Sequence, residues 1–451
     1  MNKNSQAIRF SSAEGDRTIQ IPAILQILIV FVLVVFLTSR KVHLGLAAII
    51  GGLAIALWRG LSLGTIAEVI FADVFSADTI LLVCLMSLIM VFSSAMKKAG
   101  AMDRLARSII AVAPSRRIAI ALAPMLIGTL PVPGGAVLSA PMVESMNSEG
   151  RMSPDALSAA NYFFRHIMEL IWPLYPAFVM TLALAQIPAF TLLSLQFYSA
   201  PLLFFLGTVF LLPKKTWNGE AKKTKTRPGE KKESFIAGIA PLAIALGSYG
   251  VFTLLWGLLS PVLGLPKAAN ALIARYATIL LGLAAGCIYV GLGKTGFSVF
   301  KGSLKSSTFR LILVLVGIRI FSALLGAAGA ALEAAAELER SGFPPVVATA
   351  LIPLAAGLVT GVGYGYVGLA FPIVFGMIPS DGAFPKEATI TLAAAFGYAG
   401  MMLSPLHVCM VVSAEHFKAK LPSTIRRVAL PVGIFLLIAI AYSTAIAAIV
   451  G

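Results

Sequence analysis

The chain has 451 residues, of which 59% are hydrophobic and only 12% are charged, about half the charged share of an ordinary soluble domain. This composition excludes a soluble enzyme, a disordered chain and a disulfide-stapled domain. The formal net charge of +16 does not indicate a nucleic-acid partner, because the basic residues lie in short clusters between apolar runs, as in multi-pass membrane proteins. We therefore expect a protein embedded in the lipid bilayer of the cytoplasmic (inner) membrane.

Several apolar runs are long enough to cross the hydrocarbon core of a bilayer, which takes about 20 helical residues. A polar N-terminal tail, residues 1–20, precedes the first of them. The predicted spans lie at about 21–39, 42–59, 78–98, 193–212, 235–259, 269–292, 310–330 and 428–450.

Two further hydrophobic stretches are interrupted by prolines near their middles. Residues 156–187 contain Trp172-Pro-Leu-Tyr-Pro176, and residues 387–416 contain Ser404-Pro-Leu-His407. Proline removes a backbone donor and clashes with the preceding turn, so it ends or kinks a helix. We predict that each stretch crosses the membrane once as a broken helix made of two half-helices.

Two other stretches, 117–147 and 343–379, are punctuated by Gly128-Thr-Leu-Pro-Val-Pro-Gly-Gly135 and Thr360-Gly-Val-Gly-Tyr-Gly365. Each arm of the first has about 12 residues, or about 18 Å of helix, which is too short to cross. Non-helical backbone at membrane depth survives only inside protein or beside a water-filled cavity. We predict two re-entrant hairpins and, with the spans, about ten transmembrane helices in an all-α polytopic membrane protein.

The distribution of lysine and arginine orients these spans. With an external N-terminus, most of the 35 basic residues fall in segments on one side, which the positive-inside rule assigns to the cytoplasm. The C-terminus is then external as well, and the basic linker 213–234 is cytoplasmic. The predicted cytoplasmic segments are 40–41, 97–117, 148–155, 213–234, 294–310 and 417–427.

The linker 213–234 separates two halves, 21–212 and 235–451, that show the same order of spans, hairpin and broken helix. Short matches recur at a nearly constant offset. They pair Phe92-Ser93 with Phe321-Ser322, Ala140–Val143 with Phe371–Val374, and Trp172–Tyr175 with Ser404–His407. Each half crosses an odd number of times, so the second copy must be inverted. Inverted repeats with interrupted helices at matching places are typical of secondary transporters, whose site lies near the breaks.

This arrangement resembles the ion-transporter superfamily of secondary carriers, which includes gluconate, lactate, citrate and dicarboxylate permeases and several sodium/proton antiporters. The run Leu130–Pro141 looks like an uncharacterised prokaryotic family within it. The resemblance implies a homodimer, and a site formed by each hairpin tip with the neighbouring helix break. Sodium-coupled dicarboxylate members carry Asn at their tips, whereas neither tip nor break here contains Asn.

Mapped onto this chain, the site combines backbone freed at the breaks with nearby polar side chains. Half-helix N-termini attract anions through free N–H groups and the helix dipole, and glycine lets the backbone approach a ligand. The predicted substrate- or ion-binding residues are Thr129, Pro133, Gly134, Gly135, Arg165, His166, Glu169, Pro173, Tyr175, Thr360, Gly363, Tyr364, Gly365, Ser404, Pro405 and His407.

Buried charges in the first broken helix permit two interpretations. Arg165 and Glu169 are four residues apart on one helix face and can form a structural ion pair. Alternatively, Arg165 holds an anionic substrate while Glu169 or His166 exchanges a proton. Arg319, inside another span, reaches a ligand, a hairpin carbonyl or Glu169.

The three cysteines, Cys84, Cys287 and Cys409, lie in apolar runs with no metal-ligand spacing, and we expect them to be core residues rather than metal ligands. Ile288 stands where a P-loop would require glycine, so no ATP site is expected. The sequence predicts no cofactor beyond a coupling H⁺ or Na⁺.

The sequence favours a secondary active transporter of a small organic anion, a carboxylate, that works by alternating access. It is ion-coupled, with the proton favoured over sodium. The alternative is a cation/proton antiporter of the same fold with Glu169 as the exchanging group. A remote alternative is an intramembrane hydrolase that uses Ser404 and His407.

Overall fold

The computed structural model describes residues 21–102, 104, 113–129, 135–147, 150–214, 235–342, 344–378 and 384–450. Every regular element in these residues is helical, which confirms the prediction of an all-α polytopic membrane protein. The predicted tail 1–20 and residues 215–234 of the predicted linker lie outside the described residues.

The first half contains helices throughout its described length. They are α1 (Ala23–Ser39), α2 (Leu44–Trp58), α3 (Leu63–Val74), α4 (Ala77–Lys98), α6 (Arg116–Gly128), α7 (Gly135–Met146), α8 (Pro154–His166), α9 (Pro176–Ala185), α10 (Ala189–Gln196) and α11 (Ser199–Phe210). The predicted span at 193–212 is thus two short helices in near succession. Helix α3 occupies a stretch that the sequence prediction left unassigned.

The second half is built in the same manner. Its elements are α12 (Phe235–Leu263), α13 (Lys267–Leu272), a π-helical turn (Ile273–Ala277), α14 (Thr278–Gly291), a 3₁₀ turn (Gly296–Phe300), α15 (Ser306–Ala327), α16 (Ala330–Arg340), α17 (Pro345–Thr360), α18 (Gly363–Gly376), α19 (Lys386–Leu403), α20 (Val408–His416) and α21 (Leu421–Val450). Among the described residues, 7 helical segments are long and apolar enough to cross a membrane. Helices α1, α2, α9, α17 and α18 are apolar but shorter.

Both predicted helix breaks are present, and local chemistry explains where they fall. Helix α8 ends at His166, and α9 begins at Pro176, whose missing N–H costs little in the first turn of a helix. Helix α19 ends before Ser404, which is extended (φ −71°, ψ 125°), as expected for a residue that precedes proline. Helix α20 then begins after His407.

The hairpin predicted at 343–379 corresponds to the pair α17–α18. Helix α17 ends at Thr360, the next residue, Gly361, has a left-handed conformation (φ 61°), and α18 begins at Gly363. Only glycine adopts such a backbone readily, so this sharp tip follows directly from the sequence. The hairpin predicted at 117–147 corresponds to α6 and α7, while its tip, 130–134, lies outside the described residues.

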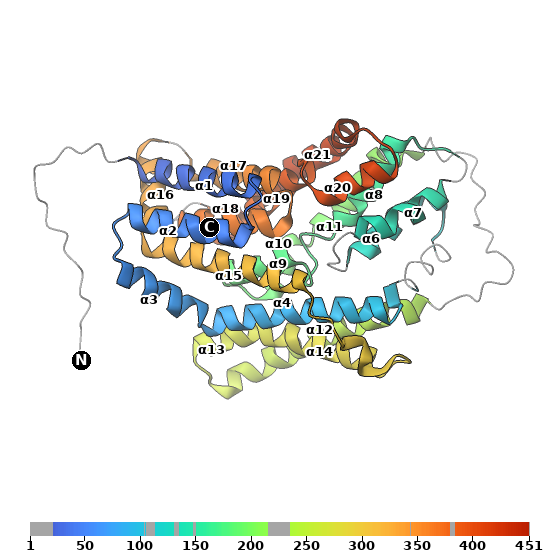
Figure 1. Cartoon of the computed structure of the whole chain (residues 1–451), viewed down its shortest axis with the longest axis horizontal. Coiled ribbons are helices and arrows are strands. Elements are labelled where there is room, and N and C mark those ends of the chain that lie inside the picture. Colours follow the sequence, from blue (N-terminus) through green and yellow to red (C-terminus); the bar gives the residue numbers. More distant parts are fainter. Residues whose placement is uncertain are drawn as a thin grey trace, which may run out of the picture.

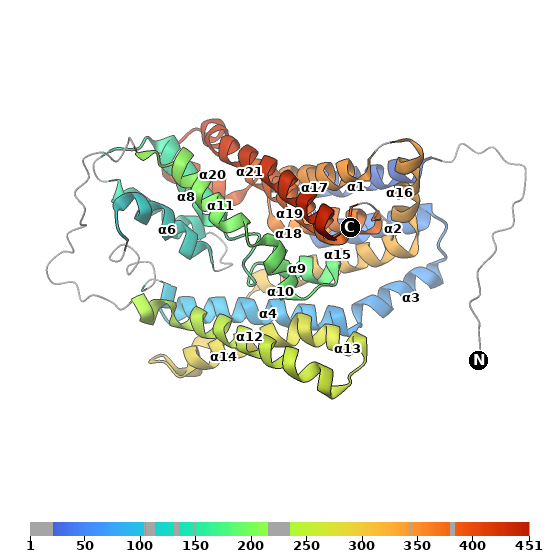
Figure 2. The ribbon, with the colours of Figure 1, turned by 180° about the vertical axis from the view of Figure 1, so that it is seen from behind.

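The helices form layers along the long axis of the molecule. Helix α4 contacts α14 on one side and α9 and α15 on the other, as seen from two sides in Figures 1 and 2. The pair α17–α18 lies toward the same end as α16, whereas α6 and α7 lie toward the opposite end. Helices α8 and α19 therefore approach the middle of the molecule from opposite ends.

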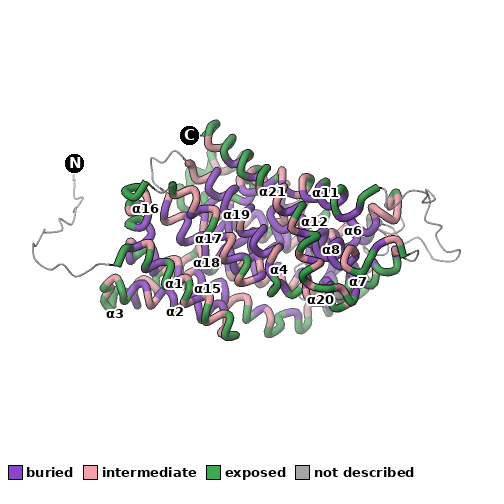
Figure 3. Tube along the Cα trace, turned by 90° about the horizontal axis from the view of Figure 1, so that it is seen from above, coloured by how far each residue is buried: buried purple, intermediate pink, exposed green. Residues whose placement is uncertain are grey.

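The broken helices and the second hairpin make up much of the core. Most described residues of α8, α9, α18 and α19 are buried, whereas α3 is largely exposed and α7 is only partly buried (Figure 3). Exposed apolar side chains are numerous on α12 and α21, as expected for helices that face lipid. The core thus surrounds the two breaks rather than the long spans.

Glycine allows several helices to approach closely. At Gly357 of α17, an added Cβ would lie 2.3 Å from the carbonyl oxygen of Gly397 of α19. At Gly128 of α6, it would lie 2.2 Å from the carbonyl oxygen of Arg165 of α8. Small residues at helix contacts are how membrane helices pack without a hydrophobic driving force. These contacts fix the helices that carry the breaks.

Candidate functional site

A cavity of about 460 Å³ lies where the two helix breaks meet the tip of α17–α18. This volume is within the range of about 300–1,000 Å³ that holds small-molecule ligands. The described residues that line it are His43, Met90, Arg165, His166, Glu169, Tyr175, Pro176, Ser307, Arg310, Leu311, Val314, Gly361, Val362, Gly363, Tyr364, Met401, His407, Val408 and Cys409.

Three helices begin at this cavity. Tyr175 and Pro176 start α9, Gly363 starts α18, and His407 and Val408 start α20. The first turn of a helix carries free backbone N–H groups and the positive end of the helix dipole. Three such ends at one cavity create a positive potential that favours an anion.

The first break supplies most of the polar side chains. Arg165 and His166 end α8, and Glu169 lies in the following turn; all three are buried and line the cavity. The Tyr175 hydroxyl donates to the carbonyl oxygen of Gly128, so it ties the break to α6. Arg165 therefore lies beside the cavity at the level where α9 begins.

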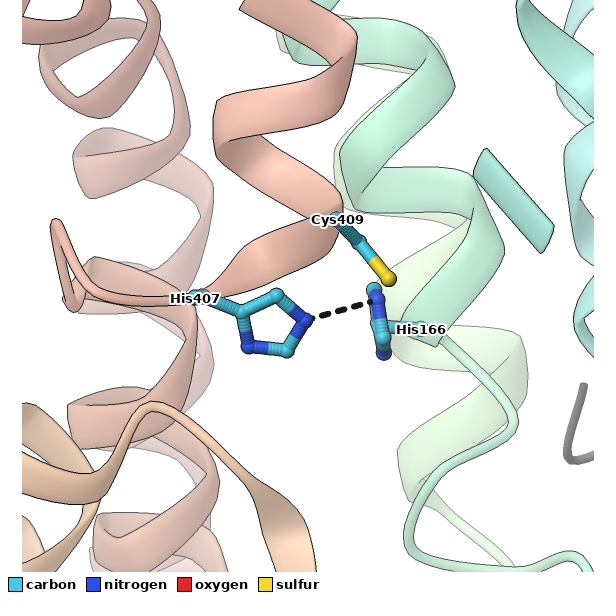
Figure 4. A group of neighbouring side chains, drawn as sticks. All are labelled: His166, His407 and Cys409. Carbon is cyan, nitrogen blue, oxygen red and sulfur yellow. Dashed lines mark hydrogen bonds between the residues drawn. The ribbon is translucent and has the colours of Figure 1, made fainter. Parts of the chain in front are cut away.

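A chain of three side chains joins the two halves of the sequence. Glu169 Oε2 lies 3.2 Å from His166 Nδ1, and His166 Nε2 lies 3.1 Å from His407 Nε2. Figure 4 shows the two imidazoles facing each other, with the Cys409 thiol beside His166. The hydrogen-bond partner of Glu169 in this row of side chains is His166, three residues away, whereas the sequence offered Arg165, one helical turn away, as a possible ion-pair partner.

Two residues outside the predicted site, Tyr162 and Asn161, brace this row of three side chains. The ring of Tyr162 lies 5.2 Å from that of His166 and 5.0 Å from that of His407. Its hydroxyl donates to the carbonyl oxygens at the end of α19, at 3.2 Å for Met402. Asn161 Nδ2 donates to Ser413 Oγ at 2.8 Å and so ties α8 to α20. In the sequence, the only hint of these two roles is that Asn161 and Tyr162 precede Arg165 by one helical turn within an apolar stretch.

The tip of α17–α18 packs directly on the breaks. A Cβ added at Gly363 would lie 2.4 Å from Glu169 Oε1, and one added at Gly361 would lie 2.9 Å from the backbone nitrogen of His407. The Glu169 carboxylate consequently lies at the N-terminus of α18, where the dipole stabilises negative charge. Side chains larger than hydrogen do not fit at either glycine without movement.

The structure brings part of the predicted set together at the cavity. The predicted residues that line it are Arg165, His166, Glu169, Tyr175, Gly363, Tyr364 and His407. They come from both halves of the chain, so the two breaks meet. Their roles remain predictions.

Other predicted residues lie nearby but outside the lining. Thr129 and Thr360 use their hydroxyls within their own helices, donating to Leu126 and Ala356. Pro173, Gly365 and Pro405 shape the breaks and the tip without lining the cavity. Pro133 and Gly134 lie outside the described residues, and Gly135 begins α7 with its surroundings not described.

Ser404 and His407 do not form a nucleophile and base. Ser404 Oγ donates to the carbonyl oxygen of Leu358 at 2.6 Å, whereas His407 Nε2 faces His166. The serine hydroxyl caps the end of α17 and does not line the cavity. The geometry that a hydrolase would need is therefore not formed by this pair.

Cys409 packs against the core, as expected, and it also lines the cavity beside both histidines. One interpretation of a single residue is wrong. Arg319 does not reach Glu169, because its guanidinium lies 2.5 Å from Asp73 and 3.2 Å from Asp78. The sequence could not show the contact between Arg319 and Asp73, because these residues are 246 positions apart along the chain.

The lining also includes basic residues that the site prediction lacked. His43 precedes α2 and accepts from the backbone of Gly45, and Arg310 lies in the first turns of α15. Both flank the cavity from helices outside the hairpins and breaks. In the sequence, each of these residues is a basic residue at the start of a predicted span, and this position was the only indication of its place at the cavity.

A family described as "Protein of unknown function (DUF401)" matches residues 23–445. The chain belongs to this family. Among curated proteins, no sequence matches significantly.

A solved structure, that of the YdaH transporter of Alcanivorax borkumensis, is similar with a TM-score of 0.59 and 14% identity. The match covers 87% of this chain and 90% of that chain, and its description reports an unusual topology. At this identity the similarity establishes the fold alone: the chain is a multi-pass membrane protein with the fold of a transporter.

Proposed function

We propose that this protein is a secondary active transporter of a small organic anion with at least one carboxylate. The observation that carries the proposal is the meeting of three helix N-termini and the buried Arg165 at one cavity. Helix N-termini bind carboxylates through free N–H groups, and a guanidinium binds them with two parallel hydrogen bonds. Interrupted helices that point their N-termini at a central site are how membrane carriers hold anionic substrates.

The charges around the cavity support an anionic substrate. Arg165 and Arg310 line it, and Glu169 is the only carboxylate among the described lining residues. The formal balance is 2 − 1 = +1 before the histidines and helix dipoles are counted. An anion of modest size compensates this charge, whereas a cation would add to it.

We further propose that transport is coupled to protons rather than to sodium. Sodium prefers several hard oxygen ligands, and the described lining offers few side-chain oxygens besides Glu169. Neither predicted tip and neither break contains Asn. The cation/proton antiporter is the competing function, with Glu169 as its exchanging group.

The remaining features of the proposal concern the whole molecule. The carrier belongs to the ion-transporter superfamily, is built as an inverted repeat and works as a homodimer by alternating access. Its termini are external and its linker 213–234 is cytoplasmic in the inner membrane. The approach of α6–α7 and α17–α18 from opposite ends supports the inverted repeat.

A ligand screen followed by uptake tests the proposal. Purified full-length protein is screened by thermal unfolding against small mono-, di- and tricarboxylates and sugar acids. A ligand at 100 times its Kd should stabilise the folded state by about 2.7 kcal/mol. The best ligand is then followed into proteoliposomes under an imposed pH gradient or sodium gradient.

The matched variants are Arg165→Ala in the cavity and Arg340→Ala on the exposed end of α16. We expect Arg165→Ala to abolish ligand stabilisation and uptake, and Arg340→Ala to leave both unchanged. Uptake driven by the pH gradient alone supports proton coupling. If adding Na⁺ or K⁺ causes proton release and no carboxylate stabilises the protein or is taken up, the protein is a cation/proton antiporter and not an anion carrier.

A further inference from the structure

We propose that His166, His407 and Cys409 form a binding site for a thiophilic transition-metal ion, such as Zn²⁺ or Co²⁺, within the cavity. The imidazole nitrogens and the thiol sulfur of these residues all lie within 4.8 Å of one another. The three residues come from α8 and from the start of α20, and their side chains converge in Figure 4. Their sequence separation, 241 residues between the histidines, hides the site from any spacing rule.

The distance between the histidines fits a shared metal ion. His166 Nε2 and His407 Nε2 are 3.1 Å apart. Two nitrogen ligands at about 2.0–2.1 Å from a tetrahedral zinc ion lie about 3.3 Å from each other. The two imidazoles need to move by only a few tenths of an ångström, while the thiol, which lies within 4.8 Å of the histidine ligand atoms, closes in as a thiolate.

Glu169 occupies the place of the residue that orients a metal-bound histidine. Its carboxylate lies 3.2 Å from His166 Nδ1. When Nδ1 donates to that carboxylate, Nε2 carries a lone pair that points toward His407 and Cys409. Metal-ligating histidines usually donate their second N–H to a carboxylate, and this contact raises their basicity and fixes the ring.

The donor set selects the class of metal. Two imidazoles and a thiolate suit borderline and soft ions, whereas Mg²⁺ and Ca²⁺ require oxygen ligands. Three protein ligands leave a fourth tetrahedral position open, as in sites that bind a substrate or water. All three residues line the cavity, so the open position faces it and takes an anionic oxygen, such as a carboxylate.

The metal site itself does not depend on the proposed transport function; only the carboxylate at the open position rests on it. The test is a cobalt titration of purified full-length protein that has been stripped with a chelator. Tetrahedral Co²⁺ bound to thiolate gives a charge-transfer band and visible ligand-field bands. We expect one ion per chain, displaced by Zn²⁺ and not by Mg²⁺.

Variants locate the ion. Cys409→Ser should abolish the charge-transfer band and lower the affinity at least 100-fold, and His407→Gln should lower it comparably. Glu169→Gln keeps all three ligands and should lower the affinity about 10–100-fold. The matched controls are Cys84→Ser, at an exposed thiol of α4, and His416→Gln, at the C-terminal end of α20, where the ring is half-buried and contacts Glu144; both should bind cobalt as the unmodified chain does.

The site is refuted if no stoichiometric cobalt binds, or if Cys409→Ser keeps the band and the affinity. Loss of binding in Cys84→Ser would also refute it. Cys409→Ser replaces sulfur by oxygen with little change in shape, so it decides the question even if His407→Gln fails to fold. A shift of the visible bands on adding a carboxylate supports the open position, and unchanged bands refute that part. If the unmodified protein binds cobalt but takes up no carboxylate in proteoliposomes, only the proposed transport function is refuted.

Discussion

Two clusters of buried charge in this protein are arranged in different ways. The arginine–aspartate network, formed by Asp73, Asp78, Arg275 and Arg319, joins α3, α4, α15 and the π-helical turn before α14. The cavity cluster, formed by Arg165, His166, Glu169 and His407, lies at the two helix breaks. Both clusters are largely shielded from solvent.

The difference lies in how each charge is compensated. In the network, each arginine lies 2.5 Å from an aspartate, and the two signs balance. In the cavity cluster, the only carboxylate contacts an imidazole at 3.2 Å, and the group opens onto about 460 Å³ of space. Charges that satisfy one another hold helices together, whereas charged groups that line a cavity can also contact a ligand.

The largest expected effect is the loss of stability when the arginine–aspartate network is broken. Arg319→Ala leaves the Asp73 carboxylate without its arginine, and breaking a buried ion pair by removing one partner costs about 3–5 kcal/mol. Thermal or denaturant unfolding of the purified protein measures this loss. Arg340→Ala, at an exposed arginine of α16, serves as the control and should change stability by less than about 0.5 kcal/mol. If the Arg319→Ala protein is as stable as the unmodified protein but no longer binds the ligand, the network serves ligand binding rather than stability. The two clusters would then not differ in role.

The next effect concerns the contact between the hairpin tip and the cavity cluster. Gly363→Ala places a Cβ 2.4 Å from Glu169 Oε1, and overpacking of this kind costs about 1–3 kcal/mol. We also expect ligand-induced stabilisation to disappear, because the α18 N-terminus is displaced. Gly247→Ala in α12, where an added Cβ meets nothing within 4 Å, should not destabilise the protein.

A double change sharpens that result. Glu169→Ala removes the atoms that the new Cβ meets, so the pair Gly363→Ala with Glu169→Ala should be more stable than the sum of the single effects predicts. Strict additivity in a double-mutant cycle would show that the tip and Glu169 do not interact.

Arg165 tests whether the cavity cluster serves a ligand or the fold. Arg165→Ala removes the positive charge near Glu169, and leaving a charged group poorly compensated costs about 1–3 kcal/mol. The double variant Arg165→Ala with Glu169→Gln removes both charges and should regain stability without regaining uptake. Recovery of both stability and uptake would make this cluster structural, like the network.

The smallest effect concerns the brace behind the histidines. Tyr162→Phe keeps the ring between His166 and His407 but removes the hydroxyl that donates to the carbonyl oxygen of Met402. The loss of one such hydrogen bond costs about 0.5–1.5 kcal/mol in unfolding experiments. Tyr289→Phe, at an exposed tyrosine of α14, should be neutral. If both variants lose the same free energy of unfolding, Tyr162 does not brace the histidines.

Features that depend on local chemistry were predictable from the sequence. Prolines at 173, 176 and 405 interrupt the helical backbone locally, so the breaks between α8 and α9 and between α19 and α20 lie where we expected them, although other prolines, such as Pro353 of α17, lie inside helices. Gly361 and Gly363 similarly specify the sharp tip of α17–α18. Apolar length predicted the long spans, but it missed α3, because a short helix with a mixed surface has no clear signal of this kind.

The amino-acid sequence by itself determined that this is a helical membrane protein with two broken helices, since bilayer thickness, proline and glycine act on each segment separately. Only the tertiary structure decided which side chains meet. It paired Arg319 with Asp73 instead of Glu169, and it placed His166 of the first half beside His407 of the second half. Contacts between residues hundreds of positions apart depend on how helices pack, and packing depends on many weak interactions that no single segment contains.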